Sequence, residues 1–174
     1  MHIARIVLQL LGLVALIPTV ALATIYLQHR DADGPSILVP GGALVSGPLH
    51  AGPEPDWRFT DAVPVVELQL TDPVSSRRVW IAEAEGRIFV PSGYMTSWLG
   101  RIWKHWAYQA EQGDGRAVVR IAGTRYERRL ERVREGPILD AVAAKLGTKY
   151  GAAFSRADIE AGHTWIFELA ALEE

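Results

Sequence analysis

Side chains able to bind a ligand gather in one short segment, residues 96–107, which reads TSWLGRIWKHWA. Arg101 and Lys104 carry positive charge there, His105 adds an imidazole, and Trp103 offers a large flat ring. A guanidinium fork and an ammonium group suit a phosphate, and an indole ring suits a flat aromatic ligand. These four side chains are therefore candidates for an anion-binding site, with an exposed basic helix as the alternative interpretation.

The other large residues of this segment repeat with the period of a helix. Trp98, Ile102 and Trp106 recur every four residues, so a helix over residues 95–112 places them on one stripe. We expect this stripe to face the core, because large apolar side chains at that spacing are usually buried.

Several other kinds of site lack the residues that they need. The 174-residue chain has no cysteine, which excludes disulfides, thiolate nucleophiles and Cys-type zinc sites. No two of the five histidines have a helical ligand spacing, so we predict no metal site. The serines have no nucleophile-elbow context, which argues against a hydrolase. No catalytic residue can be named, and a solvated helical histidine is the alternative to a catalytic His105.

A second basic segment, residues 125–134 (RYERRLERVR), has the alternation of a β-strand. Its charges are mixed, which predicts a solvated strand face rather than an anion site. Nucleic-acid binding is not predicted, because glutamates interrupt the arginines and the formal net charge of the chain is −2.

Near its start the chain has an uncharged apolar run over residues 6–27, long enough to cross a bilayer. Pro18 kinks such a helix without forbidding it. Residues 21–23 (ALA) have the form of a signal-peptidase site, so a cleaved secretory signal is the competing interpretation. We favour an uncleaved anchor, because the apolar run continues past this site.

The side of the membrane follows from the flanking charges. Arg5 precedes the apolar run, whereas Arg30 is followed at once by two aspartates that contribute little to orientation. This slight bias predicts a single-pass protein whose folded part lies on the extracytoplasmic, periplasmic side. Secretion after signal cleavage is the alternative.

Composition divides the chain into three parts. Residues 1–30 form the transmembrane anchor or signal peptide, and residues 31–55 form a linker rich in glycine and proline. Residues 56–174 are expected to form a single folded domain, because the chain is too short for two ordinary domains.

Alternating hydrophobicity and turn residues predict a mainly β domain with added helices, an α+β fold. A short turn at residues 85–86 and another at residues 122–124 each join two antiparallel strands. Two flanking helices are expected, and closing the sheet into a small closed or partly open barrel would remove exposed edges. The expected strands are residues 63–70, 78–84, 87–90, 117–121, 125–133 and 164–169, and the expected helices are residues 95–112 and 137–150.

Four segments in this order resemble a known superfamily: RRVWIAEAEGRIFVPSG, the WKHW region, GRAVVRIAGTRYERRLERV and AAKLGTKYG. Together they are similar to the split-barrel flavin-binding superfamily, which includes pyridoxamine 5'-phosphate oxidase-like proteins and deazaflavin-dependent reductase-like proteins. The likeness is nearest to an uncharacterised branch of small split-barrel domains and covers roughly residues 56–172. It implies a small antiparallel split β-barrel.

The resemblance also implies a cofactor, FMN or a deazaflavin, whose phosphate is often held across a dimer interface. Carried over by position, Arg78, Ser92, Arg101 and Lys104 are the expected phosphate ligands. A tryptophan would cover the flavin ring, for which Trp103 is the candidate.

Two functions remain open at this point. One is a membrane-anchored oxidoreductase in which a hydride passes at the flavin N5 atom. The other is a cofactor-free module on the same fold, tethered to the membrane through residues 6–27. Such a module would bind another membrane protein or assemble with its own copies, and a homodimer is compatible with either function.

Overall fold

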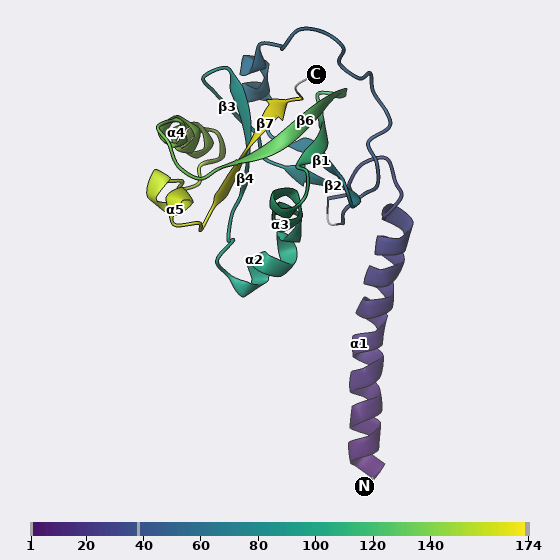
Figure 1. The fold of residues 1–174 in the computed structure, drawn as a ribbon. Helices are drawn as coiled ribbons and strands as arrows, with labels where there is room; N and C mark the ends of the chain where they lie inside the picture. The colour runs from purple at the N-terminus through teal and green to yellow at the C-terminus, as the bar shows by residue number, and fades with distance from the viewer. Residues whose placement is uncertain (1, 38, 173–174) are drawn as a thin grey trace.

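A single helix stands apart from the folded domain at the start of the chain (Figure 1). The computed structural model describes residues 2–37 and 39–172. Within α1 (His2–His29), the span Ala4–His29 has a mean hydropathy of 2.4, and none of its most apolar stretch is buried. Its length and composition suffice to cross a membrane, and signal sequences share these properties. The prediction of an N-terminal apolar helix is therefore confirmed.

The domain is built on one antiparallel sheet of seven strands in the order β2-β1-β5-β6-β7-β4-β3. In Figure 1 the sheet curls around a core into a half-barrel, so the predicted α+β fold with a small split barrel is confirmed. The strands are β1 (Val66–Thr71), β2 (Val74–Val79), β3 (Ala82–Ala84), β4 (Arg87–Ser92), β5 (Arg116–Ile121), β6 (Thr124–Val133) and β7 (Trp165–Ala171).

Both predicted hairpins form around two-residue turns. Glu85 and Gly86 have φ values of 53° and 75°, and Ala122 and Gly123 have φ values of 48° and 85°. Positive φ at both central residues is the geometry whose twist matches that of the flanking strands. β3 therefore pairs with β4, and β5 pairs with β6, as expected.

The expected strand over residues 78–84 is wrong as a single element. Its first part belongs to β2, which pairs with β1, and its last part is β3, at the opposite edge of the sheet. Only Trp80 and Ile81 join the two edges, and three peptide units span about 10 Å at most. The sheet must therefore curl until its edges nearly meet, and the split of the barrel lies at these two residues.

The expected helix over residues 95–112 is also divided. It consists of α2 (Trp98–Trp103) and α3 (His105–Gln112), which meet at Lys104 with φ −104° and ψ 25°. Trp106 is buried as predicted, but Trp98 and Ile102 are 70 % and 68 % exposed, so their assignment to the core is wrong. Because the helix breaks at Lys104, the side chains of α2 do not continue the buried stripe of α3.

The remaining helices cover the sheet. α4 (Ile138–Tyr150) packs its apolar face on β3 and ends at Tyr150, as expected, and the next residue, Gly151, has a φ of 65°. A short helix α5 (Arg156–Glu160) and a 3-10 helix η1 (Trp57–Ala62) complete the domain and had no sequence counterpart. The domain thus has more than the two flanking helices that were expected.

Parts of the segment that follows α1 pack on the sheet. Gly41 pairs with Ser76 at the edge of β2, and the buried Leu44 donates its N–H to the Gln69 side chain at 2.7 Å. Asp33 accepts a hydrogen bond from Arg120 of β5 at 2.8 Å. The chain is therefore attached to the sheet only four residues beyond the end of α1.

Strand β6 has the expected alternation, but one of its faces is not solvated. Arg128 has a side chain only 4 % exposed, and it donates to Glu54 at 2.9 Å and 3.0 Å. Its guanidinium carbon lies 4.8 Å from the centre of the Trp57 ring. The mixed-charge pattern thus hides an ion pair whose arginine is buried and whose glutamate is half-exposed.

Candidate functional site

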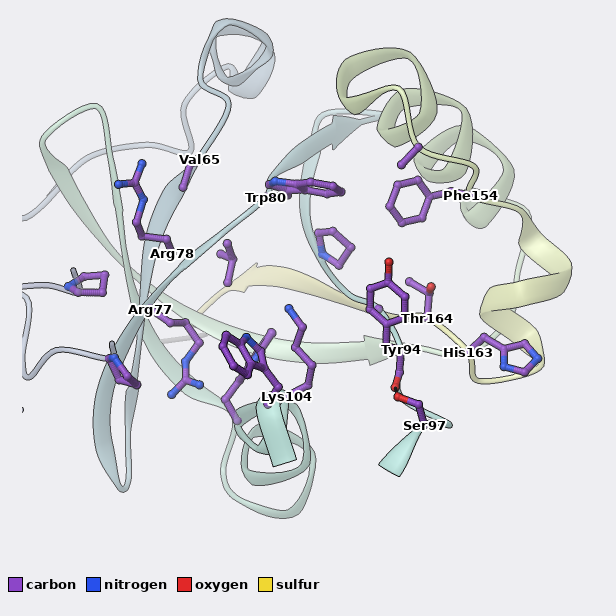
Figure 2. Close-up of a pocket in the computed structure, with 18 of the residues that line it drawn as sticks. Val65, Arg77, Arg78, Trp80, Tyr94, Ser97, Lys104, Phe154, His163 and Thr164 are labelled. Carbon is purple, nitrogen blue, oxygen red and sulfur yellow. Dashed lines mark hydrogen bonds between the residues drawn. The ribbon is translucent and has the colours of Figure 1, made fainter. Parts of the chain in front are cut away.

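A cavity of about 920 Å³ lies beside the split of the barrel (Figure 2). Strand β2, the loop that follows β4, the junction of α2 with α3, and residues 152–154 form its walls. Part of the segment over residues 35–40 borders it. The cavity is within the size range of small-molecule and cofactor sites.

Arg77 projects into this cavity from β2. Its Nη2 atom donates to Ser75 Oγ at 2.5 Å, and its guanidinium carbon lies 5.5 Å from the centre of the Trp106 ring. The Nε atom is buried and has no hydrogen-bond partner among the described residues. Burial lowers the pKa of Arg77 to about 10, because a charged guanidinium loses hydration there.

Lys104 reaches the cavity from the junction of α2 and α3. The break in the helix gives this residue a half-buried position on the wall of the cavity that Arg77 also lines (Figure 2). Burial, and then the positive charge of Arg77, lower the pKa of Lys104 below its ordinary value. Within the described part of the chain, neither cation has a carboxylate within 4.0 Å.

Other shielded arginines of the domain are paired, which sets these two cations apart. Arg120 bonds Glu67 at 2.5 Å and Asp33 at 2.8 Å, and Arg132 bonds Glu111 at 2.7 Å. A partly buried positive charge without a counter-ion is unfavourable unless a ligand supplies the negative charge. The structure therefore has the chemistry of an anion site at Arg77 and Lys104.

An aromatic wall stands across the cavity from the two cations (Figure 2). Trp80 is 40 % exposed and stacks on Tyr150, with ring centres 4.4 Å apart and planes 5° apart. Phe154 lies edge-on to the same indole at 6.3 Å. An aromatic ligand could pack against this wall while its anionic group meets the cations.

The end of α4 fixes this wall at the split of the barrel. The Tyr150 hydroxyl accepts a hydrogen bond from the Ile81 N–H at 3.0 Å and lies 2.8 Å from the Pro64 carbonyl oxygen. Lys149 Nζ donates to the carbonyls of Ile81 and Thr60 at 2.9 Å and 2.7 Å. These contacts satisfy backbone groups that have no strand partner, and they hold Trp80 in place.

A polar side of the cavity is formed where the loop before α2 meets the loop before β7. Thr96 Oγ1 and His163 Nδ1 lie 2.8 Å apart, and the Met95 N–H donates to the His163 carbonyl at 3.0 Å. Ser97 caps α2 by accepting from the Gly100 N–H at 2.9 Å. Hydroxyl and imidazole groups of this kind can add hydrogen bonds to a bound anion.

The structure brings together three of the six site residues expected from sequence. Lys104, Trp103 and Arg78 line the cavity, although the Arg78 guanidinium points away from Lys104 (Figure 2). Ser92 is fully buried, and its hydroxyl contacts the Met95 sulfur at 3.2 Å. The last two, Arg101 and His105, are exposed and lie outside the cavity lining.

Sequence reasoning missed Arg77 and Trp80. Arg77 could have been found from the alternation of a strand. Arg78 pairs with Glu67 of β1, and successive side chains of a strand point to opposite faces, so Arg77 lies on the face opposite to Arg78. The signal for Trp80 was weaker, because its position depends on Tyr150, 70 residues along the chain.

The fold and cavity define a split-barrel-like α+β domain that carries a cationic, aromatic-walled cavity and follows an apolar helix. No family model matches the chain, and no curated protein matches it. A crystal structure of the conserved hypothetical protein Rv2991 from Mycobacterium tuberculosis is similar over 66 % of this chain and 77 % of that one. The sequence identity is 14 % and the TM-score 0.46, too distant a likeness to carry a residue role or an activity to this chain.

Proposed function

We propose that this protein is a membrane-tethered domain that binds a phosphorylated aromatic ligand of the flavin type, FMN or a deazaflavin, in the cavity beside the split. The observation that carries the proposal is the pair formed by Arg77 and Lys104, which line the same cavity, are half-buried and have no carboxylate partner among the described residues. A phosphate would supply the missing negative charge, and the buried Arg77 Nε offers it an unused donor.

The rest of the cavity fits such a ligand. The exposed part of the Trp80 ring, backed by Tyr150, offers a flat apolar surface for the ring system. Ser97 and Thr96 lie on the polar side and suit the hydroxyl groups that link the ring to a phosphate. The cavity volume of about 920 Å³ is adequate for a ligand of this size.

An oxidoreductase activity would follow from the cofactor, since a bound flavin supplies hydride transfer. The protein's own residues would bind the phosphate, orient the ring and limit its exposure to water. The resemblance to split-barrel flavoproteins supports this step. The cofactor-free interaction module is the competing function, and absence of binding would favour it.

The proposed location follows from α1. A 28-residue helix whose most apolar stretch is fully exposed suits a bilayer, and the slight charge bias at its ends favours an extracytoplasmic domain.

The experiment is to purify the full chain in detergent and record its absorbance between about 350 and 500 nm, where flavins absorb and side chains do not. We expect either a flavin spectrum or uptake of added FMN or deazaflavin. Arg77→Met and Lys104→Met should each weaken binding by about 1.5–3 kcal/mol, tenfold or more. The control Arg129→Met, at an exposed arginine of β6, should bind normally.

A colourless preparation that takes up neither cofactor would refute the flavin proposal. Binding of inorganic phosphate alone, lost in Arg77→Met, would retain the anion site and change the class of ligand.

A further inference from the structure

Four large side chains around α2 are exposed to an extent unusual for a folded domain. Tyr94, Trp98, Ile102 and Trp103 are 79 %, 70 %, 68 % and 76 % exposed, and they lie within ten residues of one another. We call these four residues the α2 patch. A contiguous group of aromatic and aliphatic side chains on a surface marks an interaction site.

The structure holds the α2 patch outward. Ser97 caps the helix, and Gly100 lies so close to the chain before it that a Cβ atom would sit 1.7 Å from the Tyr94 carbonyl oxygen. The backbone break at Lys104 then separates α2 from the buried stripe of α3. The exposure of the patch is therefore a property of a capped and tightly packed turn.

The patch lies toward the membrane if α1 is in the bilayer. Figure 1 shows α2 at the end of the domain toward which α1 extends. The domain is also closely tethered to the helix, because the Gly42 N–H donates to the Ala32 carbonyl at 2.9 Å and Arg120 binds Asp33. Few residues are left between α1 and these contacts, so the domain is kept near the surface from which the helix emerges.

The composition of the patch suits the boundary between lipid and water. Tryptophan and tyrosine are enriched at this boundary, since their rings are apolar with a polar edge. Arg101, exposed between Trp98 and Ile102, is placed to contact lipid phosphates. Trp103 also lines the cavity, so the docked surface would border the proposed ligand site.

We propose that the α2 patch inserts into the headgroup region of the same leaflet from which α1 emerges. The domain would then touch the membrane at two places, the end of α1 and the α2 patch. This inference rests on α1 as a membrane anchor, and it is independent of which ligand the cavity binds.

The test uses single spin labels, which the cysteine-free sequence allows. Three full-length variants, Ile102→Cys, Leu16→Cys and Glu127→Cys, are labelled and placed in bilayer nanodiscs containing anionic lipid. Leu16 lies in α1 and reports the anchor, and Glu127 lies on the exposed face of β6 and reports water. Collision with oxygen, enriched in lipid, is compared with collision with a water-soluble nickel complex.

We expect the oxygen-to-nickel accessibility ratio at Ile102→Cys to lie between the other two and severalfold above that at Glu127→Cys. A ratio equal to that at Glu127→Cys, with Leu16→Cys deep in lipid, would overturn the inference and leave the anchor intact. A water-exposed Leu16→Cys would instead refute the anchor. A label at Ile102→Cys shielded from both reagents would mean that a second copy or another protein covers the patch, which also overturns the inference.

Discussion

Replacing Arg77 by methionine should make the ligand-free protein more stable, contrary to the usual effect of changing a partly buried residue. Methionine keeps the length of the side chain and removes a charge that has no counter-ion among the described residues. Replacing poorly compensated buried charges by apolar groups of similar size is often stabilising.

The magnitude follows from the pKa of Arg77, which burial lowers by more than two units from its ordinary value, to about 10. At about 1.4 kcal/mol per pKa unit, the charged form costs about 3 kcal/mol in the folded state. Arg77→Met removes this cost, but it also removes the contacts with Ser75 and with the Trp106 ring. The loss of these contacts offsets part of the gain in stability. We expect a net stabilisation of about 1–2 kcal/mol, or about 2–8 °C in Tm for a domain of this size.

The assay is thermal unfolding of the full chain in detergent at neutral pH, with and without phosphate. Wild type should gain Tm when phosphate is added, because an anion bound to the native state stabilises it. Arg77→Met should start from a higher Tm and gain little from phosphate. The control Arg129→Met removes an exposed arginine and should change neither property. A lower Tm in Arg77→Met together with an unchanged response to phosphate would refute an uncompensated charge at this position.

Three further outcomes follow from other contacts. Phosphate binding needs protonated Lys104, whose pKa is lowered, so affinity measured by calorimetry between about pH 7 and 10 should fall earlier than for an ordinary lysine. At about pH 9, below the pKa of about 10 at which Arg77 itself loses its charge, Lys104→Arg should bind more strongly than wild type, and a flat wild-type profile would contradict the role of Lys104. Gly100→Ala should destabilise α2 by about 2 kcal/mol, seen as faster amide exchange there, because its Cβ would overlap the Tyr94 carbonyl. Glu54→Gln should lower the free energy of unfolding in urea by about 2 kcal/mol, because Arg128 stays buried without its carboxylate. A wild-type urea midpoint would show that this pair contributes nothing.

The hairpins and α4 could be predicted because their signals are local. Turns at residues 85–86 and 122–123 contain the glycines that positive φ favours, and Gly151 marks the end of α4. The curled sheet followed from the same pattern, because several short antiparallel strands need a way to remove their edges.

The two breaks could not be predicted, because no glycine or proline marks them. Residues 78–84 are β-rich throughout, yet the barrel splits at Trp80 and Ile81, where Tyr150 satisfies the backbone. Residues 95–112 have a helical pattern throughout, yet the helix breaks at Lys104. Both breaks depend on tertiary contacts that local propensity does not encode.

These breaks also explain why the residues that line the cavity differ from those expected from the sequence. The expected strand begins at Arg78 and leaves Arg77 out, whereas β2 begins at Val74 and includes both residues, so that Arg77 also lines the cavity. Because the helix breaks at Lys104, Trp98 lies on the surface and Lys104 lines the cavity.

Phosphate binding by Arg77 and Lys104 is tested most directly by comparing FMN with riboflavin, which lacks the phosphate. Fluorescence titration of the full chain should give FMN a clear advantage, about tenfold or more for a charged hydrogen bond. In Arg77→Met and Lys104→Met the advantage should shrink, while Arg129→Met should retain it. Equal affinities of wild type for FMN and riboflavin would contradict phosphate binding by Arg77 and Lys104. A preference for FMN that remains in both variants would contradict it as well.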